Sequence, residues 1–98
     1  MNEKLIIRKN IFSDEGFLSE MELSYYIIEK LSGTSTFYGV RIVKKTIENG
    51  AHICEDNSSD CIFSDATEIA EFINILIRYE VTPLSLDTVL SDYFSLTA

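Results

Sequence analysis

The apolar residues of this chain change their spacing once, from every second residue to every third or fourth, and this change constrains the fold more than any other feature. Across residues 21–31 and again across residues 36–48, apolar and polar residues alternate, which is the period of a β-strand. Residues 32–35 separate the two stretches with turn-forming types. Asn49-Gly50 follows, a dipeptide that favours a tight type I′ hairpin turn because both positions accept positive φ. The centre of the chain is therefore predicted to be an antiparallel sheet.

The flanks of these two strands are less regular. Residues 4–12 are rich in β-branched types and predict a further strand, with a turn at residues 13–16. A return strand is expected to begin at residues 51–54, after Asn49-Gly50. Residues 55–60 are entirely polar, so we predict a loop or a frayed edge there. Gly39, inside an alternating stretch, indicates a bulge or an aromatic side chain stacked over the backbone.

Residues 65–80 have the period of a helix. Asp65 is a good N-cap, and Glu68 three residues later completes a pattern that resembles a capping box. The apolar arc comprises Ile69, Phe72, Ile73, Leu76 and Ile77, and is widened by Ile75 and Tyr79. It covers about 200°, well beyond the ~100° that one packed surface needs. We therefore expect this helix to contact two partners.

The second partner is predicted directly downstream. Thr82 is an N-cap candidate, and Pro83 occupies the first helical position, where its missing N–H costs nothing. Leu86, Val89, Leu90 and Tyr93 then share one face. The fold class follows: α+β, an antiparallel β-meander of three to four strands followed by two C-terminal helices packed on one face, in two layers. Ninety-eight residues form one domain, 1–98, with residues 1–20 as a strand or an irregular, variable arm.

Charge excludes some classes of partner. The formal net charge is −8, from 16 acidic and 8 basic side chains, and this disfavours nucleic acid and anionic membranes. Arg41, Lys44 and Lys45 form the one basic cluster, close to aromatic residues, and a cluster this small gives weak phosphate binding. No apolar run is long enough for a signal peptide or a membrane span, so we expect a cytoplasmic protein.

The residues with most chemical potential lie between His52 and Cys61. His52 and Cys54 are two apart, so both point to one face of a strand, and Cys61 would reach them if the intervening residues formed a loop. Three such ligands with a carboxylate suit zinc, although the spacing matches no recognised motif. Isolated small apolar cysteines are the simpler interpretation. We therefore expect no bound metal, and keep a metal- or redox-responsive protein as the alternative.

Catalytic and calcium-binding patterns are incomplete. Residues 56–60 begin like a calcium loop, but Cys61 stands where the loop needs glycine and Thr67 where it needs a bidentate acid. Cys54 has His52 as a partner, but no third orienting group or oxyanion hole is evident. We expect no enzymatic activity and no cofactor.

Four short segments carry a resemblance to a known family. They are residues 25–29 (YYIIE), 38–42 (YGVRI), 81–86 (VTPLSL) and 92–94 (DYF). With these segments the chain resembles a family of small uncharacterised clostridial proteins, a domain of unknown function, over residues 21–94. The resemblance implies a small bacterial intracellular domain and brings no activity or catalytic residue with it.

The remaining class is a protein that acts by being bound. The wide apolar arc of residues 65–80 and the open edge of a two-layer sheet both favour contact with a protein partner or a second copy, most simply as a homodimer. The predicted interface residues are Ile75, Tyr79, Phe94 and Leu96.

Overall fold

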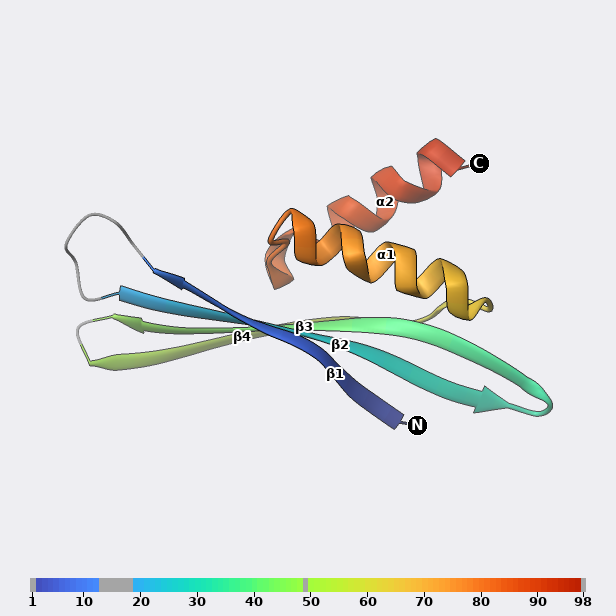
Figure 1. The fold of residues 1–98 in the computed structure, drawn as a ribbon, viewed down its shortest axis with the longest axis horizontal. Helices are drawn as coiled ribbons and strands as arrows, with labels where there is room; N and C mark the ends of the chain where they lie inside the picture. The colour runs from blue at the N-terminus through green and yellow to red at the C-terminus, as the bar shows by residue number, and fades with distance from the viewer. Residues whose placement is uncertain (1, 13–18, 49, 98) are drawn as a thin grey trace.

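The chain folds into one antiparallel sheet with two helices on one of its faces (Figure 1). The computed structural model describes residues 2–12, 19–48 and 50–97. The elements in chain order are β1 (Asn2–Phe12), β2 (Ser19–Ser32), β3 (Ser35–Glu48), β4 (Ala51–Phe63), α1 (Ala66–Arg78), the short 3₁₀ helix η1 (Pro83–Ser85) and α2 (Leu86–Thr97). The strands lie in the order β1-β2-β3-β4. The predicted α+β meander with two C-terminal helices is confirmed.

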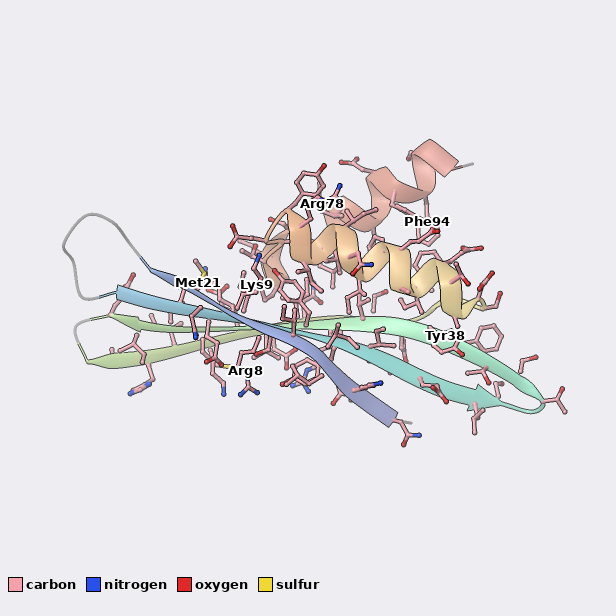
Figure 2. All side chains as sticks on the ribbon, viewed as in Figure 1. Arg8, Lys9, Met21, Tyr38, Arg78 and Phe94 are labelled. Carbon is pink, nitrogen blue, oxygen red and sulfur yellow. The ribbon has the colours of Figure 1, made fainter. Side chains whose placement is uncertain are left out.

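The two faces of the sheet have different roles. The helix face carries Leu23, Tyr25 and Ile42, which are buried in the core beneath α1 and α2. We call the opposite side the open face, and it carries Ser24, Tyr26 and Arg41. Figure 2 shows the alternation at β1, where Lys9 lies on the helix side of the sheet and Arg8 on the open side. The period of two seen in the sequence thus sorts core residues from the open face.

Tight turns join the strands where the sequence predicts them. Gly33 and Gly50 both have positive φ, 62° and 82°, which a residue with a Cβ rarely adopts. Gly33 lies in the turn between β2 and β3, and Gly50 in the turn before β4. Asn49 and the turn predicted at residues 13–16 lie outside the described residues.

The prediction of a loop or a frayed edge at residues 55–60 is wrong. β4 runs unbroken from Ala51 to Phe63 and pairs with β3 along this length. These residues are polar because β4 is an edge strand and most of them are exposed, so neither face of this segment needs to be apolar.

Gly39 marks a bulge, as the sequence predicts. The register between β3 and β4 shifts between Tyr38 and Val40. A Cβ on residue 39 would overlap the carbonyl oxygen of Ser59 and the Cα of Asp60. Only glycine allows the two backbones to approach this closely.

α1 contacts two partners, as its wide apolar arc predicts. Asp65 caps the helix, because its Oδ1 accepts a 2.7 Å hydrogen bond from the backbone N–H of Thr67. Phe72 packs 5.5 Å from Phe63 of β4 and 5.0 Å from Tyr93 of α2, measured between ring centroids. The buried residues of α1 are Ile69, Phe72, Ile73 and Leu76, while Ile75 and Ile77 are half-buried. The chain itself therefore covers most of this arc.

The C-terminus of α1 ends in a Schellman motif built without glycine. Val81 N–H donates to the carbonyl of Leu76 at 3.0 Å, and Glu80 N–H donates to the carbonyl of Ile77 at 3.2 Å. Glu80 is the left-handed residue, with φ of 50°. Lys9 of β1 donates to the same Ile77 carbonyl at 3.1 Å, which anchors the outer strand to the helix layer.

Candidate interaction surfaces at the sheet edges

β1 exposes an apolar edge. It is the outer strand on its side of the sheet, so only β2 pairs with it among the described residues. Leu5, Ile6 and Ile7 are 41%, 38% and 39% exposed. The register shift between Leu5 and Ile7 inserts Ile6 as an extra residue, which is why three apolar side chains follow one another at this edge. Unpaired backbone groups beside exposed apolar side chains are the usual template for an added strand.

The same edge is basic. β1 carries Lys4, Arg8 and Lys9 against a single carboxylate, Glu3. Arg8 Nε donates to Ser24 Oγ at 3.2 Å and lies 3.4 Å from Glu22, with 49% of its side chain exposed. Lys9 Nζ lies 3.9 Å from the Glu80 carboxylate, a long ion pair. Both cations therefore keep exposed surface at the edge.

β4 forms the opposite, acidic edge. It carries Glu55, Asp56 and Asp60 and no lysine or arginine. A hollow of about 360 Å³ runs between β4 and the start of the second helix, and is lined by Glu55, Asp56, Asn57, Pro83, Leu84 and Asp87. Asn57 Nδ2 donates to the carbonyl of Pro83 at 3.0 Å, which holds η1 against the strand. Leu84 is 86% exposed at this hollow. The two sheet edges thus carry opposite charge.

Arg41 is the centre of a charge cluster on the open face. Its Nε donates to the two carboxylate oxygens of Asp56 at 3.0 and 3.1 Å, and its Nη1 to Glu3 at 3.2 Å. Its guanidinium also lies 5.7 Å from the ring centroid of Tyr26. The hydrogen bond from Arg41 lowers the pKa of Asp56, and the bonds from Asp56 and Glu3 raise the pKa of Arg41. Arg41 thus links β1, β3 and β4 and is already matched by two carboxylates.

The basic cluster predicted from the sequence is divided by the sheet. Lys44 pairs with Leu23 and Glu55, so it belongs to the helix face, while Lys45 pairs with Glu22 and Cys54 on the open face. Arg41, Lys44 and Lys45 therefore do not present one continuous cationic surface.

The predicted interface residues are spread over the helix layer. Tyr79, the C-cap of α1, is 69% exposed, and Ile75 is half-buried. Phe94 is 42% exposed and packs 5.6 Å from Phe63, which lies near the N-terminal end of α1. Tyr79 is at the C-terminal end of α1, whereas Phe63, which Phe94 contacts, also packs on Phe72 in the middle of this 13-residue helix. Figure 2 shows Arg78 and Phe94 at different places along α1. The side chain of Leu96 lies outside the described part of the chain.

The metal- or redox-site alternative fails on geometry. His52 and Cys54 share the open face as predicted, and Cys54 is exposed. Because β4 is continuous, Cys61 lies seven residues further along an extended strand, about 23 Å from Cys54. Backbone positions this far apart permit neither a shared metal nor a disulfide. Among the described residues, no group of three or more His, Cys, Asp or Glu side chains is placed to hold a metal.

Comparison with known families agrees with the sequence resemblance. A model for a family of unknown function, DUF6514, matches residues 2–96. The chain belongs to DUF6514. The match begins with β1, so the resemblance noted over residues 21–94 extends to nearly the whole chain. A search of the curated proteins and of the solved structures found no match. Neither α1 nor α2 has the length and apolar character of a membrane span.

Membership of DUF6514, a family of unknown function, assigns no role to any surface, and the two sheet edges are the surfaces whose charge and exposure call for one. The sequence analysis does not identify the hollow at the β4 edge. The hollow cannot be inferred from the sequence as long as residues 55–60 are predicted to be a loop or a frayed edge. One signal is available: Asn49-Gly50 starts a return strand, and the alternation of residues 36–48 offers it a pairing partner that extends well beyond residue 54.

Proposed function

We propose that this domain is a non-enzymatic protein-interaction module that binds its partner by adding a strand to the β1 edge. The observation that carries the proposal is the run of Leu5, Ile6 and Ile7, each about two-fifths exposed on a strand with one free side. In strand addition the unpaired backbone groups supply affinity, while alternate side chains select the partner. A basic edge of this kind selects an acidic extended segment.

The edge is rigid enough to act as a docking template. Lys9 binds the C-terminal carbonyl of α1, and Arg41 binds Glu3, so each half of β1 is fixed to another element. A preorganised strand loses little conformational entropy when a partner pairs with it. Tyr79 and Phe94, two of the predicted interface residues, lie at different places along α1, so the proposal rests on the strand edge instead.

The test compares proteins captured by the wild type with those captured by an edge variant. Ile6→Lys places a charge on the bulge, where the side chain is 38% exposed, so it disturbs the edge and leaves the core intact. The matched control is Leu31→Lys, the same kind of change at a 71% exposed residue beside the β2–β3 turn. Quantitative crosslinking from native cells should give a partner, or a second copy, that Ile6→Lys loses and Leu31→Lys keeps. Equal capture by all three proteins would refute strand addition at β1.

A further inference from the structure

We propose that the acidic hollow along β4 receives β1 of a second copy, so that chains join head to tail through a continuous sheet. This inference rests on the proposed function and names the partner of the β1 edge. It concerns a surface, the β4 edge, that the strand-addition proposal does not itself require. Four observations carry it: strand direction, register, charge and the lining of the hollow.

Strand direction permits the pairing without rearrangement. All three strand pairs are antiparallel, so β4 runs opposite to β1. A second copy placed beside the first, with its helices on the same side, therefore brings its β1 antiparallel to β4. The added pair has the same sense as every pair already in the sheet.

Register places opposite charges together on both faces. Residues directly opposite across the four strands form rows, one of which is Arg8, Ser24, Val43 and Asp56, and the next Lys9, Leu23, Lys44 and Glu55. If the rows of the second copy continue those of the first, its Arg8 lies opposite Asp56 on the open face. Its Lys9 then lies opposite Glu55 on the helix face.

Other registers lose this match. A shift by one residue moves every side chain to the wrong face. A shift by two places Lys9 opposite Ile53 or Asn57, and Arg8 opposite Cys54 or Ser58. Among registers near the in-phase one that keep the faces aligned, only the in-phase register pairs both cations with carboxylates.

The hollow can accommodate the side chains that this register brings to it from β1 of the second copy. Ile7 belongs to the row of Asn57 on the helix face, so it meets the part of the hollow bounded by Pro83 and Leu84. Burial of the 86% exposed Leu84 against an isoleucine removes apolar surface from water. Two residues further along, Lys9 lies in the row of Glu55, which lines the hollow together with Asp87. A second carboxylate is favoured there because the ion pair of Lys9 with Glu80 of its own chain is long, at 3.9 Å.

Pairing of β1 with β1 of another copy is the competing arrangement. Centred on Ile6, it sets Lys4 opposite Arg8 twice and Glu3 opposite Lys9 twice, so repulsion and attraction offset each other and charge gives this arrangement no net gain. The bulge at Ile6 also changes which face each half of β1 presents. The β4 edge instead offers each of Arg8 and Lys9 a carboxylate on its own face of the sheet, so it is the better partner for β1.

A charge-swap experiment tests the pairing. The variants are Lys9→Glu, Glu55→Lys and the double swap Lys9→Glu/Glu55→Lys, followed by light scattering over a wide concentration range at low salt. The wild type should gain mass with concentration and pass beyond a dimer, because a head-to-tail contact does not close at two copies. Each single variant should associate about tenfold more weakly, because it replaces an attraction by a repulsion.

Mixing provides the decisive measurement. The β1 edge of a Lys9→Glu chain carries a carboxylate at position 9, which meets the new ammonium at position 55 of a Glu55→Lys chain. The reverse contact is the wild-type pair, so a mixture of the two single variants should regain association. The double swap should regain it alone. Lys4→Glu is the control, because it makes the same charge change on β1 opposite the uncharged Ser59. Circular dichroism of each variant separates lost assembly from lost folding.

Three results would overturn the inference. The first is a wild type that stays monomeric, and the second is a wild-type mass that stops at the dimer and is unchanged by Glu55→Lys. The third is a mixture of the two single variants that does not regain association. The second result would assign a β1–β1 dimer. If the wild type is monomeric but Ile6→Lys still abolishes capture of another protein, only the self-assembly inference fails. If Ile6→Lys changes neither capture nor mass, strand addition at β1 fails as well.

Discussion

The hydroxyl of Tyr25 is the one polar group that links the centre of the sheet to the end of α1 among the described residues, and its removal is a direct test of how the two layers are joined. Tyr25 is fully buried, and its hydroxyl donates a 3.0 Å hydrogen bond to the carbonyl of Val81, which is also buried. Tyr25→Phe keeps the ring, so it creates almost no cavity. It removes the donor and leaves a buried carbonyl oxygen without that bond.

The expected magnitude follows from that loss. A buried acceptor left without its hydrogen bond costs about 1–3 kcal/mol. In a domain of this size each kcal/mol lowers the melting temperature by about 4–8 °C. Urea denaturation at about pH 8, below the tyrosine pKa, should show a lower midpoint with an unchanged slope, because the surface exposed on unfolding is the same.

The pH dependence provides an independent check. Burial, with a smaller effect from the charge of Glu80, raises the pKa of Tyr25 to about 12. The folded pKa lies above the unfolded value of about 10, so the stabilisation by the neutral hydroxyl is complete below pH 10. It is lost as the pH rises from about 10 toward 12, because the unfolded chain then releases its proton first. The difference in unfolding free energy between the wild type and Tyr25→Phe should therefore shrink over that range.

Tyr38→Phe is the matched control. Tyr38 lies on the same face of the sheet but is only half-buried, so the substitution should change the unfolding free energy by less than about 0.5 kcal/mol. If Tyr25→Phe costs no more than Tyr38→Phe near neutral pH, the hydroxyl does not join the layers. A stability difference that stays constant up to about pH 11 would refute the pKa argument alone.

Three further substitutions test local geometry. Glu80→Gly should raise the unfolding free energy by about 1 kcal/mol in urea denaturation, because glycine adopts the φ of 50° without strain, whereas Glu80→Ala should give no such gain. Gly39→Ala should lower the melting temperature sharply, by the equivalent of about 1–3 kcal/mol or more, since its Cβ overlaps Ser59; an unchanged melting temperature would mean that the bulge is not tightly packed. Asp65→Ala should cost about 1 kcal/mol in the same assay by removing the cap on Thr67, and Asp65→Asn should restore most of it.

The sequence predicts those parts of the fold that depend on local periodicity. β2 and β3 each bury one face beneath the helices, so their apolar residues alternate visibly. α1 packs against both the sheet and α2, so its arc is wide. Gly39 and Asp65 are identifiable because bulges and caps restrict the residue type at a single position.

The sequence hides those parts that depend on a neighbouring strand. Most of β4 is exposed, so its extent is set by pairing with β3 and leaves no alternation to read. The C-terminal motif of α1 is hidden for a different reason, because Glu80 holds a position that normally takes glycine. The exposure of the predicted interface residues on α1 depends on how the other elements pack against the helix, which periodicity alone does not show: Ile75 is half-buried and Tyr79 is 69% exposed.

The charges of the two edges provide the strongest reason to regard them as contact surfaces. A sheet that only has to avoid edge-to-edge pairing is protected by like charge on both edges, since each copy then repels the next. This sheet has the opposite arrangement, with Arg8 and Lys9 on β1 and Asp56 and Glu55 on β4, at matching rows. Lys9 and Glu55 also lie on the side where the hollow leaves room for an incoming side chain. Protection alone does not account for this pattern, whereas the proposed pairing of the two edges would.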